Sequence, residues 1–202
     1  MTHILASKVA PRDALFDVEG FAQLLTRWNR TINLIGREDI ADLAERHIAD
    51  SLDLIPLIPP NVSRAIDLGS GAGFPGLVLA DATGITFDLI EADQRKAAFL
   101  REAARLTGAP VVIHPIRIEA ATLPPAQLLT ARALAPLPRL LTLAAPLLAS
   151  NGVALFPKGQ KAAEELTQAA REWHMRAETI AGRSTPGAVI LRITELRRAP
   201  SG

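Results

Sequence analysis

Apolar residues recur every three or four positions through the first sixty residues of the chain. They form two runs, Val18 to Ile32 and Ile40 to Ile55. This spacing places them on one face of an amphipathic helix. Three prolines between positions 56 and 60 then end the pattern, because proline cannot continue a helix. The sequence therefore predicts a helical segment over residues 1–60.

Beyond residue 60 the pattern changes to short apolar runs that alternate with amphipathic segments. Helices are expected at "PGLVLADATG", "DQRKAAFLREAARLTG", "LPRLLTLAAPLLA" and over residues 160–172. Strands are expected at "RAIDLG", "ITFDLIEA", "PVVIHP", "LLTARA", "GVALFPKG", "WHMRAETI" and "GAVILRITEL". Such alternation predicts an α/β fold with a mostly parallel sheet between two helical layers. The last two strands have no helix between them, which predicts an antiparallel hairpin at one edge.

The composition limits the chemistry that this fold can perform. The chain has no cysteine, which excludes disulfides, cysteine-ligated metals and a thiolate nucleophile, and we expect no metal site. A net charge of +1 does not indicate a general nucleic-acid binder. No apolar run is long enough for a signal peptide or a membrane span, so we expect a soluble, cytoplasmic protein, and we expect a monomer.

A glycine-rich stretch, "DLGSGAGFPG" at positions 67–76, lies between a predicted strand and a predicted helix. Such a turn directs backbone N–H groups and the positive end of a helix toward one ligand. Its glycines fit two patterns. Gly71, Gly73 and Gly76 form the G-x-G-x-x-G of a dinucleotide site. Gly69, Gly71 and Gly73, with Asp67 two residues ahead, form the D-x-G-x-G-x-G of a methyl-donor site.

Two carboxylates bear on the choice between these cofactors. Asp67 ends the strand before the loop and would repel a pyrophosphate, whereas it suits the ammonium and sulfonium groups of S-adenosylmethionine, directly or through water. Glu91 ends the next strand and can accept hydrogen bonds from ribose hydroxyls, which both cofactors have. We therefore favour S-adenosylmethionine. A nicotinamide-dependent oxidoreductase remains the alternative, although the chain has no tyrosine and only four histidines to handle protons.

Several motifs together resemble one known family, the bacterial small-subunit ribosomal RNA guanine-N7 methyltransferases, also called the RsmG or glucose-inhibited division protein B family. "DLGSGAGFPG" resembles its first motif, and the other matches are "WNRTINL", "RHIADSL", "TARALAPL" and "KGQ", in the order of the family over residues 20–160. The resemblance implies a Rossmann-like, seven-stranded class I methyltransferase fold over residues 61–202, with residues 1–60 as a small helical cap. It also implies S-adenosylmethionine as methyl donor and, as acceptor, one guanine of 16S rRNA, in free RNA or in the small ribosomal subunit.

Carried over by motif, the cofactor contacts would be Gly69, Phe74, Ile118, Glu119 and Arg132. Ile118 would supply a backbone amide and an apolar wall for adenine, and Glu119 an acceptor for its amino group.

Other polar residues are candidates for the substrate. Arg132 follows the fourth strand, where it could bind cofactor, phosphate or guanine O6, and Lys158 follows the fifth, where it could meet a phosphate. Both are positioning candidates. Asn33 and His47 are candidate substrate contacts; for His47 a satisfied, half-buried side chain is the competing interpretation, and for Asn33, which would share a helix side with Asn29, capping or interhelix hydrogen bonds compete.

The chemistry of this acceptor agrees with what the chain lacks. Guanine N7 presents a lone pair at neutral pH, so methyl transfer to it needs no general base and depends on positioning and charge.

Two residues and one loop depart from the family pattern: Ile35, Gln127 and the loop 184–189, which has no basic residue. A non-catalytic ribosome-binding protein that keeps a relic cofactor loop is the third alternative.

Overall fold

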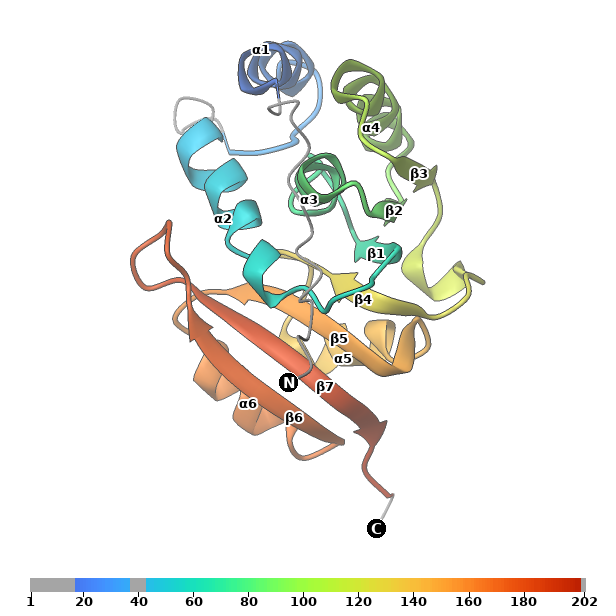
Figure 1. Ribbon diagram of the computed structural model, residues 1–202, viewed down its shortest axis with the longest axis vertical. Coiled ribbons are helices and arrows are strands. Elements are labelled where there is room, and N and C mark those ends of the chain that lie inside the picture. The colour runs from blue at the N-terminus through green and yellow to red at the C-terminus, as the bar shows by residue number, and fades with distance from the viewer. Residues whose placement is uncertain (1–16, 37–42, 201–202) are drawn as a thin grey trace, which may run out of the picture.

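Seven strands form one sheet in the order β3-β2-β1-β4-β5-β7-β6 (Figure 1). The computed structural model describes residues 17–36 and 43–200. The strands are β1 (Arg64–Leu68), β2 (Thr86–Ile90), β3 (Val111–His114), β4 (Ala126–Thr130), β5 (Leu148–Lys158), β6 (Trp173–Ala181) and β7 (Val189–Arg198). β1 to β5 are parallel to one another, whereas β7 is antiparallel to both β5 and β6. This confirms the predicted α/β fold and its edge hairpin.

Within residues 17–36 and 43–200, six α-helices cover the two faces of this sheet, and Figure 1 shows their arrangement. Their bounds are α1 (Val18–Asn29), α2 (Ala49–Leu52), α3 (Gly76–Thr83), α4 (Gln94–Thr107), α5 (Leu137–Ala144) and α6 (Ala162–Ala169). A π-helical turn (Leu43–Ile48) precedes α2, and two short 3₁₀ turns, Ile55–Leu57 and Ile118–Ala120, complete the helical segments. α1 to α4 lie on one face, and α5 and α6 lie on the other.

Local sequence signals explain several of these boundaries. The Asp93 side chain accepts a hydrogen bond from the Arg95 amide and caps the start of α4. Gly84 and Gly108 end α3 and α4 in the left-handed conformation, with φ of 73° and 69°. β1 and β2 are buried almost throughout because helices cover both faces of a parallel sheet.

Three element predictions are corrected in detail. The helix expected to continue to Ala149 ends at Ala144, because Pro146 has no N–H to donate, and β5 begins already at Leu148. The strand expected at "LLTARA" begins two residues earlier, at Ala126. The helical run expected over 40–55 is a π-helical turn followed by one α-helical turn, and its first residue, Ile40, lies outside the described residues.

The N-terminal helix α1 shares a hydrophobic core with the sheet domain. Phe21 is fully buried, and its ring lies 5.7 Å from Phe74, edge-on, and 6.0 Å from Phe99. Trp28 lies 6.1 Å from Phe99, and its Nε1 donates a hydrogen bond of 2.8 Å to Glu102 of α4. Such aromatic pairs add to the free energy of apolar burial. α1 is therefore fixed to α4 and to the glycine loop that carries Phe74.

Phe21→Ala tests how strongly this cluster anchors α1. We expect the free energy of unfolding to fall by about 3–5 kcal/mol, because the substitution leaves a cavity beside the buried rings of Phe74 and Phe99. Urea unfolding followed by circular dichroism measures the change. Gln23→Ala, at an exposed position of the same helix, is the matched control and should change stability by less than about 0.5 kcal/mol. Equal effects of the two substitutions would show that the cluster does not anchor α1.

Candidate active site

Segments that follow four parallel strands meet around a cavity of about 380 Å³ at the carboxyl edge of the sheet. The strands are β1 to β4, and ligands of open α/β sheets bind at this edge. The lining residues are Gly69, Gly71, Ile90, Glu91, Ala92, Lys96, Arg117, Ile118, Glu119, Arg132, Ala133, Leu134, Ala135, Arg139 and Leu143. We call this the β1–β4 cavity. It brings together Gly69, Gly71, Glu91, Ile118, Glu119 and Arg132 from the sequence-predicted cofactor residues.

The glycine loop has a backbone that other residues rarely adopt. Gly69, Gly71 and Gly73 have φ of 65°, 54° and 91°, in the left-handed region that favours glycine. A Cβ atom at Gly69 would also lie 2.6 Å from Leu134 Cδ1, across the cavity wall. The loop therefore requires glycine for its conformation at three positions, which is the spacing of the methyl-donor pattern.

Glu91 connects the ends of β1 and β2. Its side chain is buried, and its Oε2 accepts a hydrogen bond of 2.9 Å from the Gly71 amide while Oε1 accepts one of 2.8 Å from the Asp93 amide. A carboxylate can accept about four hydrogen bonds, so two sites remain for donors in the cavity. Glu91 thus orders the glycine loop and lines the cavity at once.

Asp67 lies beneath the glycine loop, fully buried, and is not among the residues that line the cavity. Its Oδ1 accepts a hydrogen bond of 2.6 Å from Thr130 Oγ1 on β4. Burial raises the pKa of Asp67 from 3.8 to about 6, against the opposing effect of its hydrogen bonds and of Arg132. A Cβ atom at Gly76 would lie 2.6 Å from Asp67 Cβ, so α3 begins directly against this side chain.

A second, larger cavity of about 570 Å³ adjoins the first. We call it the cap cavity, because Asp50 and Asp53 from the helical cap line it. Its other lining residues are Arg132, Ala133, Leu134, Ala135, Pro136, Pro157, Lys158, Gly159, Glu165, Gly182, Ala188, Val189 and Ile190. The segment Arg132–Ala135 lines both cavities and forms the wall between them.

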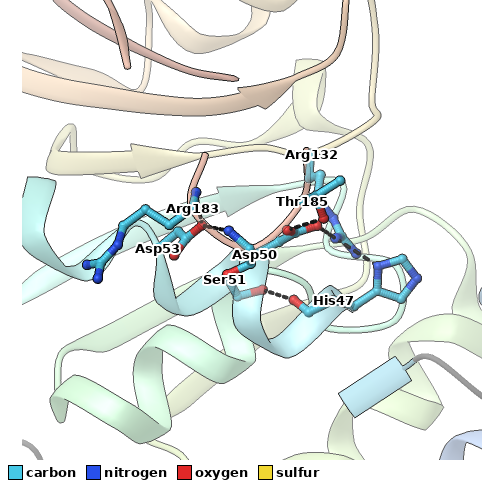
Figure 2. A network of polar contacts seen from close by, with 8 residues as sticks. His47, Asp50, Ser51, Asp53, Arg132, Arg183 and Thr185 are labelled. Atoms are coloured by element: carbon cyan, nitrogen blue, oxygen red, sulfur yellow. Dashed lines mark hydrogen bonds and ion pairs between the residues drawn. The ribbon is translucent and has the colours of Figure 1, made fainter. Parts of the chain in front are cut away.

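Arg132 is held at this wall by groups of the helical cap and the glycine loop (Figure 2). Its Nη1 donates a hydrogen bond of 3.0 Å to His47 Nδ1 and lies 3.9 Å from Asp50 Oδ2. Its guanidinium also lies over the Phe74 ring, 5.1 Å from the centroid. Because arginine only donates, Nδ1 of His47 acts as acceptor. His47 is half-buried and its Nδ1 is hydrogen-bonded, in line with the competing interpretation of the sequence, and its substrate contact stays a prediction.

Asp50 and Asp53 attach the loop of the edge hairpin to the cap (Figure 2). Thr185 Oγ1 donates a hydrogen bond of 2.7 Å to Asp50 Oδ1. The amides of Arg183 and Ser184 donate to Asp53 Oδ2 at 2.7 and 2.8 Å. These contacts close one side of the cap cavity. The loop 184–189 has no basic residue, and the Thr185 hydroxyl makes its polar contact with the cap.

Lys158 lies in the cap cavity and is paired with an acid. Its Nζ donates hydrogen bonds to Glu165 Oε2 at 2.8 Å and to the carbonyl of Ala135 at 2.9 Å. Burial would raise the pKa of Glu165, but hydrogen bonds from Lys158 and from the Leu137 amide lower it overall. Only 12% of the Lys158 side chain is exposed, so this is not a free surface cation, and its phosphate contact stays a prediction.

Asn29 and Asn33 do not share a helix side, which corrects that expectation. α1 ends at Asn29, whose buried side chain accepts hydrogen bonds from the Leu34 and Ile35 amides and donates to the Ile35 carbonyl. Asn29 thus shapes the turn by the expected capping role. Asn33 is exposed and outside the lining of both cavities, and its substrate contact stays a prediction.

The Phe74 side chain faces the cap, where its ring lies against Phe21 and His47, and it is not among the residues that line the β1–β4 cavity.

Sequence reasoning missed the residues that shape the wall between the cavities. Leu134, Asp50, Asp53 and Glu165 were not candidates. The one local signal was the spacing of Asp50 and Asp53, three apart and therefore on one side of a helix.

In the described part of the chain, no group of three or more His, Asp or Glu is arranged to hold a metal ion. Within the same residues, no helix has the length and apolarity to cross a bilayer.

Solved structures with similar folds are methyltransferases or related enzymes. A TehB-like SAM-dependent methyltransferase from Corynebacterium glutamicum gives a TM-score of 0.60 at 14% identity, covering 87% of this chain and 97% of that one. TYW2 from M. jannaschii, solved in complex with AdoMet, gives 0.58 at 16% identity, covering 84% and 80%. At these identities the likeness concerns the fold, which is that of the class I S-adenosylmethionine-dependent methyltransferases.

Sequence relatives are much closer. Ribosomal RNA small subunit methyltransferase G from Granulibacter bethesdensis is 57% identical over 178 residues, which is 88% of this chain and 84% of the relative. The protein of the same name from Gluconobacter oxydans is 54% identical, covering 90% of this chain and 93% of the relative. The family model described as GidB, rRNA small subunit methyltransferase G, matches residues 15–184. By these matches, the chain belongs to the rRNA small subunit methyltransferase G (GidB) family.

Proposed function

We propose that this chain transfers the methyl group of S-adenosylmethionine to N7 of a guanine in 16S rRNA. The adjoining cavities carry this proposal, because methyl transfer needs a donor site and an acceptor site that meet. Family membership favours a methyl donor over a nicotinamide cofactor and over a non-catalytic ribosome-binding protein. The enzyme acts as a monomer in the cytoplasm. Its substrate is either free 16S rRNA or the small ribosomal subunit.

The residues of the β1–β4 cavity fit S-adenosylmethionine. Glu91 is fixed by two backbone amides and keeps acceptor sites for the two ribose hydroxyls. Gly69 and Gly71 expose backbone without side chains, and Ile118 offers an apolar surface suited to adenine. The buried carboxylate of Asp67 places negative charge behind the loop, which attracts a cofactor whose ammonium and sulfonium are positive. When bound, the cofactor would supply a methyl group on a positively charged sulfur.

The reaction requires no proton transfer by the protein. Guanine N7 forms a bond to the methyl carbon as the carbon–sulfur bond breaks, and the electron pair of that bond stays on sulfur. No proton moves, so no general base is required. The contribution of the chain is positioning and charge placement, and Arg132, fixed at the wall between the cavities, is the side chain best placed to orient the reactants.

The direct test is transfer of labelled methyl from S-adenosylmethionine to small ribosomal subunits from a strain without this enzyme, followed by nucleoside analysis. We expect the label in 7-methylguanosine. Guanine N7 faces the major groove and has a free lone pair at neutral pH, so it needs no deprotonation. Reactions without the protein are the control. Label in another nucleoside, or none with the cofactor bound, would refute the acceptor.

Asp67→Asn separates charge from structure at the donor site. We expect cofactor affinity to fall by about tenfold, since one charge interaction is lost. Stability should change in the opposite sense at pH 7.5: the pKa of Asp67 is raised to about 6, so its ionisation costs the folded state roughly 3 kcal/mol there. The neutral variant should be the more stable one at pH 7.5, with this advantage fully present above pH 6 and gone by pH 4.

Isothermal titration of the cofactor and urea unfolding across pH measure the two effects. In the wild type, cofactor affinity should decrease as the pH falls through about 6, and in Asp67→Asn it should not. A variant that loses stability together with affinity at pH 7.5 would assign Asp67 a structural role alone.

Arg132→Ala should reduce methyl transfer by about 100-fold while the protein still folds, because the variant loses an oriented cation beside the reacting groups. Circular dichroism checks folding, and steady-state kinetics measure the rate. Arg132→Lys keeps the charge but not the planar fork, and we expect it to recover only part of the activity. Turnover near that of the wild type in Arg132→Ala would contradict the role.

A further inference from the structure

The cap cavity lies beside the proposed donor site and has no role in the donor site itself. It shares the wall Arg132–Ala135 with the β1–β4 cavity, and its volume of about 570 Å³ is within the range of small-molecule sites. Apolar groups from three separate segments line it, among them Leu134, Pro157 and Ile190. Charged side chains lie around this apolar surface, and they are Asp50, Asp53, Arg132, Lys158 and Glu165. Such a lining suits a flat base that is taken out of its RNA stack.

We propose that the acceptor guanine binds in the cap cavity, where the Asp50 carboxylate accepts hydrogen bonds from its N1–H and 2-amino groups. The inference rests on the proposed function and adds to it a specificity-determining residue. Asp50 lines the cap cavity, and its Oδ2 is 3.9 Å from Arg132 Nη1. A base held by Asp50 therefore lies beside the wall that separates it from the donor.

Asp50 has the acceptor capacity that this role requires. Oδ1 accepts one hydrogen bond, from Thr185, and a carboxylate can accept about four. Its side chain is 20% exposed, so donors that reach it within the cavity replace little solvent and gain strength from the low dielectric. Asp53, in contrast, holds two backbone amides on one oxygen and serves mainly to fix the hairpin loop.

The same carboxylate explains selectivity between purines. Guanine presents two adjacent donors, N1–H and the 2-amino group, whereas adenine presents an acceptor at N1, which a carboxylate repels. A site built to receive donors rejects a base without them by a large factor, because a buried polar group is left unpaired. Methylation at N7 also gives the base a positive charge, and a negative group nearby stabilises that charge as it develops.

Asp50→Asn is the decisive variant, because asparagine keeps an oxygen for the Thr185 hydroxyl but loses the charge and offers donors to the base. We expect kcat/KM for the small subunit to fall by at least about tenfold, the value of hydrogen bonds to a charged group. The cofactor Kd and the Tm should stay close to those of the wild type. Asp50→Glu, which restores the carboxylate, should recover part of the activity.

Thr185→Val is the matched control, because it removes the same hydrogen bond from the loop side and leaves the carboxylate. If Asp50 only fastened the hairpin loop, Thr185→Val would lose at least as much activity as Asp50→Asn, because asparagine keeps the acceptor for the Thr185 hydroxyl, and that result would overturn the proposal. Wild-type kinetics in Asp50→Asn would overturn it too, as would loss of cofactor binding or of folding in both Asp50 variants. A wild type that binds the cofactor yet forms no 7-methylguanosine would refute the proposed function itself.

Discussion

The partly buried ion pair between Lys158 and Glu165 supports the part of the molecule where both cavities meet. One oxygen of Glu165 accepts from Lys158 and from the Leu137 amide, and Lys158 also donates to the Ala135 carbonyl. The end of β5, the helix α6 and the start of α5 are thereby joined to the wall Arg132–Ala135. Removal of one partner from such a pair leaves a partly buried charge without its counter-ion, so the wall depends on both.

Three regions that are distant in sequence converge on that wall. The cap supplies His47 and Asp50, the glycine loop supplies the Phe74 ring, and the edge hairpin supplies Thr185. Asp50 and Thr185 are 135 positions apart in the chain, yet their side chains are in hydrogen-bond contact. The helical cap is thus a structural part of the site, because it fixes the guanidinium from one side while β4 carries it from the other.

The donor side illustrates a conflict between stability and function. Asp67 is fully buried with a pKa raised to about 6, so the fold bears the cost of a charge that a neutral side chain would avoid. In the proposed function this carboxylate lies close to the positive ammonium and sulfonium groups of the cofactor, which would recover in binding what it costs in folding. A strained or costly group at a site, offset by its ligand, is a common arrangement in enzymes.

The sequence by itself determined what depends on neighbouring residues. Apolar periodicity predicted the α/β layers, and Gly69, Gly71 and Gly73 indicated a ligand-binding turn between a strand and a helix, because each of these features is set within a few residues. Only the tertiary structure decided which side chains meet. The pairing of Lys158 with Glu165, the hydrogen bond between His47 and Arg132 and the contact of Asp50 with Thr185 arise from strand order and the return of the hairpin over the cap. Such contacts depend on the path of the whole chain, and no local pattern records that path.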